Sequence, residues 1–401
     1  MGCVFYISLP HYPITQCGQF MQTIISVQEP AVAQPAPIRR LLSLDTLRGF
    51  DMFWIIGGEE IFHVLAKTTG WTSAIFMADQ FTHASWNGFR PYDCIFPLFL
   101  FLAGVSTPYS LGSRLAKGDS RVILARKVIT RGLLLVLLGV IYNNGLFTKS
   151  FDEMRFGSVL GRIGLAGMFA QLIYLYVKNE RARYGIFVGI LLAYWALLMF
   201  IPVPGYGAGN LTMEGSLVGY IDRLFMPGRL YKVVHDPEGL LSTLPAIGTG
   251  LLGVFAGTIL RQQGVRDGRK LQQLVLTGIA CITLGWLWNF IFPINKNLWT
   301  SSFVLVAGGW SLLMLSLFYW LIDMHNFRRW TFFFVVIGMN SILIYLAERI
   351  IDFEYTTHFL FGGLLHFFGE PIRGVGSVLA FLAVKWVFLY FLYKKNTFLR
   401  V

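Results

Sequence analysis

A histidine and an aspartate lie ten residues apart in a polar stretch between two apolar segments. His83 opens the block HASWNG, and Asp93 lies at the start of the next apolar run. A neutral imidazole is the natural general base near pH 7, and a carboxylate that binds its other nitrogen can orient the ring. A single histidine in a loop is more often part of the polar surface, so this spacing alone does not establish catalysis.

Ionisable residues also occur inside the first long apolar segment. Asp45, Arg48 and Asp51 follow an i, i+3, i+6 spacing, and Glu59 comes eleven residues after Arg48. In an unbroken helix Arg48 and Glu59 share one face, about 16 Å apart. Such groups cost about 2.5–3.5 kcal/mol each near a bilayer centre, so we expect them to face the interior of a helix bundle. A structural ion pair between Asp45 and Arg48 is the alternative.

Two polar clusters occur where later apolar segments begin. Asp236 and Glu238 precede a predicted helix, where carboxylates suit the positive end of the helix dipole. The alternative is a carboxylate rim that binds a cationic or polyhydroxylated solute. The second cluster, in the block FPINKNLWTSSF, opens a helix with Asn295, Lys296, Asn297 and Trp299.

Four more polar residues lie within or beside apolar runs. Asn340 and Ser341 interrupt one run, where asparagine usually joins neighbouring helices. Arg131 and Arg162 have guanidinium groups that bind phosphate as planar cations. Their alternative explanation is the general preference for basic residues near the cytoplasmic side of a membrane.

The composition shows what kind of protein must position these residues. Of 401 residues, 55% are hydrophobic and only 13% are charged, whereas a soluble domain carries about 25% charge. This excludes an ordinary soluble enzyme and predicts an all-α integral membrane protein. About ten runs are long enough to span a bilayer: 44–65, 92–112, 126–145, 157–177, 184–202, 241–260, 271–292, 300–322, 331–350 and 374–393.

The basic residues predict the orientation of these spans. If the N-terminus is cytoplasmic, most of the 33 Lys and Arg residues fall on the inner side. Both termini are therefore predicted to be cytoplasmic, and the long connections 66–91, 203–240 and 351–373 face outward. The same bias explains the net charge of +12 without nucleic acid. The cysteines show no metal-binding spacing, so no metal is expected.

The chain is predicted to consist of a disordered tail and one membrane domain. Residues 1–38 contain several prolines and no long apolar run, so they form the tail, and residues 39–401 form the domain. Gly250, Gly253 and Gly257 are spaced for close helix packing. Small residues on exposed helix faces make a homodimer possible.

Four sequence blocks carry a resemblance to a known family. They are LDTLRGFD (44–51), HASWNGFRPYDCIFPLFLFLAGVS (83–106), GYIDRL with HDPEGLL (219–224 and 235–241), and PINKNLW with GMNSILIY (293–299 and 338–345). With these blocks in the family's order, residues 40–401 resemble the heparan-α-glucosaminide N-acetyltransferase family of membrane acyltransferases. The family's first helix often has asparagine at its outer end, where this chain has Glu59.

The resemblance implies acetyl transfer across a membrane. Acetyl-CoA is the co-substrate on the cytoplasmic side, and the acceptor is the amino group of a terminal glucosamine on the far side. The chain lacks the extra luminal domain and the preceding helix of the animal lysosomal members, so a bacterial inner membrane is the expected location. A membrane O-acyltransferase of a surface glycan and an amino-sugar transporter are the competing interpretations.

The resemblance also suggests roles for the polar residues. His83 is the expected base, oriented by Asp93, and Asn87 or a backbone N–H stabilises the oxyanion. The residues expected to bind acetyl-CoA are Arg48, Arg131, Arg162, Asn340 and Ser341. The residues expected to bind the acceptor are Glu59, Trp86, Asp236, Glu238, Asn295, Lys296, Asn297 and Trp299. Direct transfer in a ternary complex and a covalent acetyl-His83 intermediate are both compatible with the sequence.

Overall fold

The described part of the chain is built from helices. The computed structural model describes residues 41–146 and 148–399, and within these ranges every regular element is a helix. The predicted tail, residues 1–38, and both chain ends lie outside the described residues. The disorder of the tail and the cytoplasmic location of the termini therefore remain predictions.

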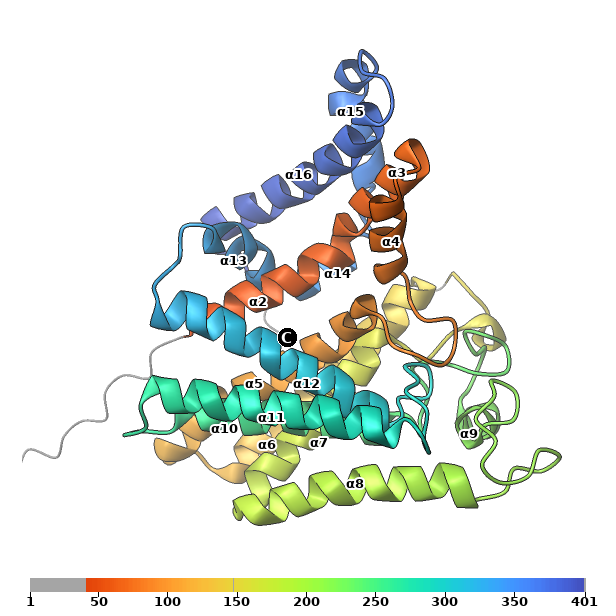
Figure 1. Ribbon diagram of the computed structural model, residues 1–401, viewed down its shortest axis with the longest axis vertical. Helices are drawn as coiled ribbons and strands as arrows, with labels where there is room; N and C mark the ends of the chain where they lie inside the picture. The colour runs from red at the N-terminus through yellow and green to blue at the C-terminus, as the bar shows by residue number, and fades with distance from the viewer. Residues whose placement is uncertain (1–40, 147, 400–401) are drawn as a thin grey trace, which may run out of the picture. The chain divides into compact units, whose positions relative to one another are not determined.

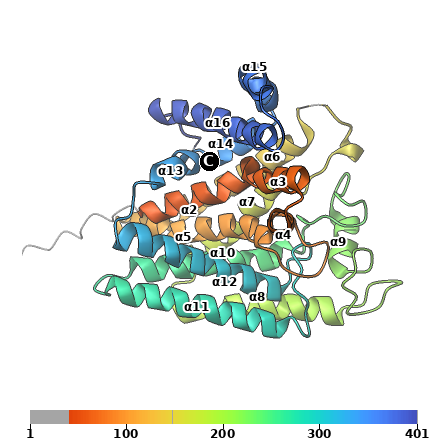
Figure 2. The ribbon, with the colours of Figure 1, turned by 45° about the horizontal axis from the view of Figure 1, so that its top comes forward.

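Seven helices in the described ranges are long and apolar enough to cross a membrane, which supports a multi-pass membrane protein. They are η2–α5 (Pro91–Ala116, in which α5 is Ile95–Ala116), α7 (Val159–Tyr176), α8 (Glu180–Phe200), α10 (Thr243–Arg261), α11 (Asp267–Trp288), α12 with η4 (Ser301–Met324) and α16 (Ile372–Lys394). Figure 2 shows several long helices side by side, among them α5, α8, α10, α11 and α12.

Three predicted spans differ from these seven. Helix α6 (Arg121–Asn144) is continuous, but its first half carries Arg126, Lys127 and Arg131 in addition to Arg121. The predicted span 44–65 is broken into α2 (Leu42–Phe53), a wider π turn η1 (Trp54–Gly58) and α3 (Glu60–Thr69). The predicted span 331–350 is broken into α13 (Thr331–Met339) and α14 (Ser341–Ala347).

The first break corrects an expectation about the polar face of this segment. Gly57 has a φ of 119°, a conformation that residues with a side chain rarely adopt. The helix therefore does not continue from Arg48 to Glu59, and the prediction that these two residues share one face of an unbroken helix is wrong. The carbonyl oxygen of Ile56 accepts a hydrogen bond from the buried Lys385 of α16 at 2.7 Å.

The connections predicted as long loops contain short helices. They are α4 (Thr72–Gln80), α9 (Leu217–Phe225) and α15 (Phe353–Leu365). Figure 1 shows α9 and its flanking loops beyond one end of the long helices, and α4 leads into a loop on the same side. The Trp86 indole donates to the carbonyl oxygen of Leu211 at 2.9 Å, which ties the loop after α4 to the connection that contains α9.

Glycines allow α5 and α10 to approach until their backbones touch. A methyl group added at Gly253 would overlap the carbonyl oxygen of Phe101, and one at Gly104 would overlap the carbonyl oxygen of Gly250. Gly257 meets the backbone of Val105 in the same way. The predicted packing role of these glycines is confirmed. Cys94 and Cys281 are buried, in agreement with a packing role.

This packing predicts that Gly253→Ala destabilises the protein by about 1–3 kcal/mol, because the methyl group must force two helices apart. Gly189→Ala in α8 is the control, since nothing lies within 4 Å of the position where its methyl group would be. Alanine is the better helix former by about 1 kcal/mol, so the control should be neutral or stabilising. Thermal unfolding of both variants in detergent measures the difference, and equal stability would contradict the proposed contact.

Candidate active site

His83 and Asp93 form a hydrogen-bonded pair at the start of α5. The Nδ1 atom of His83 lies 2.8 Å from Oδ1 of Asp93, in the η2 turn (Pro91–Cys94) that begins the helix. The other carboxylate oxygen accepts the backbone N–H of Arg90 at 3.0 Å. Asp93 is fully buried, while half of the His83 side chain is exposed. The fixed carboxylate therefore holds an imidazole that a solute can reach.

Lys296 completes this cluster from a distant part of the chain. Its Nζ atom is 2.9 Å from both ring nitrogens of His83 and 3.8 Å from Oδ1 of Asp93. Burial lowers the pKa of Lys296 to about 8, and the negative charges of Asp93 and Glu238 oppose this shift. A primary amine thus lies against the candidate base. The sequence indicated Lys296 as a binding residue but not this contact.

A cavity of about 230 Å³ opens beside the cluster. His83, Lys296 and Glu238 supply polar groups, and Ser341 of α14 lines the same space. The remaining wall is largely apolar: Met52, Ile55, Ile95, Phe96, Phe99, Val159, Leu160, Ile163 and Ile342, with the phenol groups of Tyr92 and Tyr345. A narrow apolar space with a base and an amine among its lining residues suits a chain-like ligand with one reactive end.

Tyr92 connects His83 to the break in the first helix. Its ring centroid lies 4.6 Å from that of His83, and its hydroxyl interacts with the carboxylate of Glu59. Glu59 directly follows the π turn η1. The break therefore places the Glu59 carboxylate near Tyr92, which in turn packs on His83. No local pattern distinguishes Tyr92 in the sequence, although it lies in the block that also contains His83.

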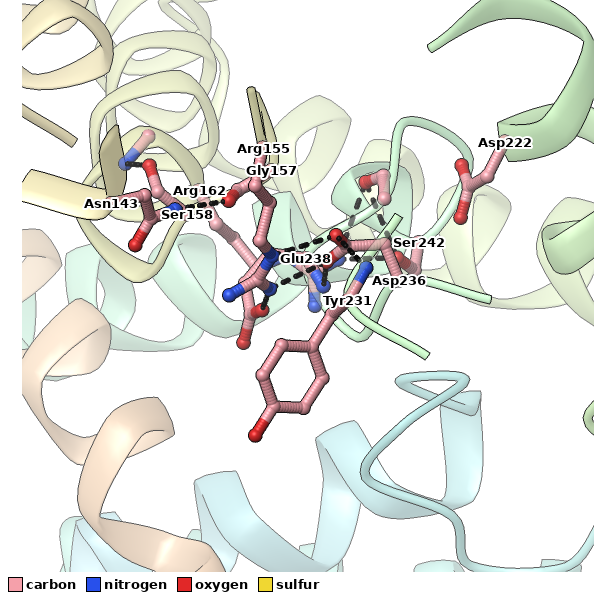
Figure 3. A network of polar contacts seen from close by, with 12 residues as sticks. Asn143, Arg155, Gly157, Ser158, Arg162, Asp222, Tyr231, Asp236, Glu238 and Ser242 are labelled. Carbon is pink, nitrogen blue, oxygen red and sulfur yellow. Dashed lines mark hydrogen bonds and ion pairs between the residues drawn. The ribbon is translucent and has the colours of Figure 1, made fainter. Parts of the chain in front are cut away.

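The predicted carboxylate rim is bound by an arginine that the sequence did not reveal. Arg155 contacts Asp236 through two nitrogens at 2.9 and 2.7 Å and also contacts Glu238, as Figure 3 shows. This guanidinium group lowers the pKa of Asp236. Tyr231 packs against Arg155, with 4.4 Å between the guanidinium carbon and the ring centroid. Asp236 is therefore a buried ion-pair partner, whereas Glu238 also reaches the cavity.

Arg162 and Trp299 form a buried pair next to the cavity wall, since Trp299 packs on the lining residue Phe96. Arg162 of α7 is buried, donates to the carbonyl oxygen of Gly239 at 3.2 Å and contacts the Ser242 hydroxyl. Its guanidinium carbon lies 5.0 Å from the ring centroid of Trp299, which is only 1% exposed. Arg162 thus lies near the predicted acceptor residues, and Trp299 is a core residue that supports it.

The predicted asparagines and Trp86 join two sequence blocks. The Asn295 side chain donates to the Asn87 side-chain oxygen at 3.0 Å and is fully buried. The backbone of Asn297 lies beside His235, and the Trp86 ring packs edge to face on His235, with 5.5 Å between centroids. These contacts fix the loop that carries His83 against the segment that carries Lys296.

The other predicted cofactor residues are not among the side chains that line this cavity. Arg48 contacts Asp45 at 3.5 Å and the Ser106 hydroxyl of α5 at 3.3 Å. Arg131 of α6 is close enough to Arg48 for their charges to interact. Asn340 donates to the carbonyl oxygen of Thr397 and accepts the N–H of Leu399.

Comparison with known proteins shows which proteins this chain is similar to. The helices and the cluster beside an apolar cavity are those of a multi-pass membrane protein with a candidate acid–base site. No family model matches the chain. It is 30% identical to the heparan-alpha-glucosaminide N-acetyltransferase of Homo sapiens over 371 residues and 29% identical to that of Mus musculus over 375 residues, each covering 78% of this chain.

These similarities confirm the resemblance to the heparan-α-glucosaminide N-acetyltransferase family that the four sequence blocks indicated. The matches cover 53% and 54% of the two relatives, so the chain spans about half the length of the curated relatives it matches.

Two buried ionisable groups near the site respond to pH in opposite directions. His235 is fully buried, and burial lowers its pKa to about 4, although the contact with the Asn297 backbone opposes this shift. Asp222 is also fully buried, and burial raises its pKa to about 7. One oxygen of Asp222 accepts the N–H of Leu240 at 2.9 Å. In the folded protein, both side chains are therefore neutral near pH 6.

The two groups predict opposite pH effects on stability. Between pH 6.5 and 4 the unfolded state binds the proton of His235 more tightly, so stability falls on acidification by about 3 kcal/mol. Between pH 4 and 7 the folded state keeps the proton of Asp222, so stability falls as the pH rises, by a similar amount. We expect His235→Gln to remove the first loss and Asp222→Asn the second. Thermal unfolding from pH 4 to 8 tests this, and parallel curves for all three proteins would contradict it.

Proposed function

We propose that the chain is a membrane acetyltransferase that moves the acetyl group of acetyl-CoA to the amino group of a glucosamine-type sugar. The observation that carries this proposal is the His83–Asp93 pair beside an apolar cavity that extends among α5, α7 and α14. The named activity of the two relatives supports it. A thioester at the end of a flexible arm and an amine can meet in such a space.

The proposed reaction begins with removal of a proton from the acceptor. An ammonium group is not a nucleophile, so His83 takes its proton at Nε2 while Asp93 binds Nδ1 and orients the ring. The amine nitrogen then attacks the thioester carbonyl carbon, and the C–S bond breaks. The imidazolium passes its proton to the departing thiolate, and the attacking nitrogen loses its second proton to solvent, which leaves a neutral amide. The Lys296 ammonium and the Asn87 amide are the groups proposed to stabilise the oxyanion.

The donor is proposed to enter from the opposite end of the helices. Arg48 and Arg131 form the basic pair for its phosphate groups, and Ser341 contacts the arm within the cavity. Arg162, Asp236 and Glu238 shape the acceptor end. This topology requires cytoplasmic termini, about ten spans and a His83 that faces the periplasm of a bacterial inner membrane.

The base is tested by adding acetyl-CoA and glucosamine to membranes that contain the protein and measuring N-acetylglucosamine. His83→Gln should lower kcat by about 10²–10⁴-fold, the usual contribution of a general base. His325→Gln is the control, because this exposed histidine contacts Trp320 of η4 and is not among the residues that line the cavity. Full activity of His83→Gln would overturn the mechanism. Products acetylated on a hydroxyl would favour an O-acyltransferase, and uptake of the sugar without acetylation would favour a transporter.

The donor site is tested with Arg48→Gln. Loss of a charged hydrogen bond to a phosphate costs about 1.5–3 kcal/mol, so the KM for acetyl-CoA should rise about 10–100-fold with a smaller change in kcat. Arg114→Gln is the control. Arg114 lies near the C-terminal end of α5, the helix that Arg48 contacts through Ser106, but Arg114 is paired with Asp119. Equal KM values for the two variants would exclude Arg48 from the donor site.

A further inference from the structure

The Lys296 amine lies beside the His83 imidazole, as the acceptor amine must in the proposed reaction. In the proposed reaction, the acceptor nitrogen must come within hydrogen-bonding distance of the His83 imidazole, at the cavity that receives the thioester. The Nζ atom of Lys296 already occupies such a position, 2.9 Å from both ring nitrogens. Lys296 itself lines the cavity. A primary amine of the protein is therefore placed like the amine of the substrate.

The surroundings of Lys296 keep this amine reactive. Only 19% of its side chain is exposed. The charged groups that act on it are Asp93 and Glu238, which favour the ammonium form, and Arg162, which disfavours it together with burial. The resulting pKa of about 8 leaves a substantial neutral fraction at slightly alkaline pH, unlike that of an exposed lysine.

We propose that Lys296 is a site of self-acetylation, which takes the acetyl group of acetyl-CoA when no acceptor occupies the cavity. This inference rests on the proposed function, since it requires acetyl-CoA in the cavity. The class of acceptor is the same as for the substrate, a primary amine beside His83.

The step uses the groups of the proposed transfer. His83 removes a proton from the Lys296 ammonium, and the neutral nitrogen attacks the thioester carbonyl carbon. An N–C bond forms, and the attacking nitrogen loses its second proton to solvent as the tetrahedral intermediate collapses. The C–S bond breaks, and the imidazolium gives its proton to the thiolate, which leaves as free coenzyme A. The product is an amide, so the reaction stops after one acetyl group.

Acetylation of Lys296 should inactivate the enzyme. The positive charge beside His83 is lost, and the acetyl group occupies the space that the acceptor needs. An amino-sugar acceptor should protect Lys296, because it competes for the same base and the same thioester. Enzyme that meets acetyl-CoA without an acceptor should therefore lose activity, whereas enzyme that meets both together should keep it.

The test incubates the purified full chain in detergent with acetyl-CoA carrying an isotope-labelled acetyl group, and maps the label by peptide mass spectrometry. Lys232 is the reference residue. It is exposed in the connection that contains Glu238, so its labelling measures the acetylation that does not depend on the site. Lys296 should be labelled at least about tenfold faster than Lys232, and faster as the pH rises through 8. Glucosamine or His83→Gln should reduce labelling of Lys296 about tenfold or more and leave Lys232 unaffected.

Activity gives a second measurement. Wild-type enzyme preincubated with acetyl-CoA alone should lose activity in proportion to the label on Lys296. Whatever activity Lys296→Arg retains should not decline in this treatment. Labelling of Lys296 no faster than Lys232, or label on His83 alone, would overturn the inference while sugar acetylation still supports the proposed function. If acetyl-CoA labels neither the sugar nor the protein, the proposed function fails, and this inference fails with it.

Discussion

A single buried carboxylate organises the candidate site. Asp93 accepts the backbone N–H of Arg90, binds the imidazole of His83 and lies 3.8 Å from the Lys296 amine. Burying a carboxylate costs free energy unless its charge is compensated and its oxygens accept hydrogen bonds. The Arg90 N–H, the His83 imidazole and the Lys296 amine together meet this need of Asp93. The loop after α4, the start of α5 and the segment before α12 are therefore fixed relative to one another at one point.

The break in the first helix is a second consequence of satisfying polar groups inside the protein. Irregular backbone within a membrane domain is tolerated only where protein or an enclosed cavity surrounds it. At this break the Ile56 carbonyl oxygen is satisfied by Lys385, whose ammonium also pairs with Glu348 at 2.8 Å. The chain can then leave the helical path at Gly57 and direct Glu59 toward Tyr92, which packs on His83.

Local sequence patterns predicted the helices but not these long-range contacts. Hydropathy located the segments of the seven long apolar helices in the described ranges, because membrane spans are long and uniform in composition. It missed the break at Gly57, because a glycine in an apolar run looks the same whether its φ is helical or positive. The His83–Asp93 pair was predictable from a spacing of ten residues, whereas the pair of Arg155 and Asp236 joins residues that are 81 positions apart. No local pattern carries that information.

The charges at the cavity bear on the proposed amine acceptor. The Arg155 guanidinium group already compensates Asp236 and contacts Glu238, so the acidic rim cannot neutralise much additional positive charge. In the proposed reaction, the ammonium of the acceptor adds a second positive charge beside Lys296 in a largely apolar space, which lowers the pKa of the acceptor amine. The proposed base for this proton is the His83 imidazole, which Asp93 holds in place. In the proposed reaction, these charges therefore favour the neutral form of the acceptor amine, which is the form that attacks the thioester.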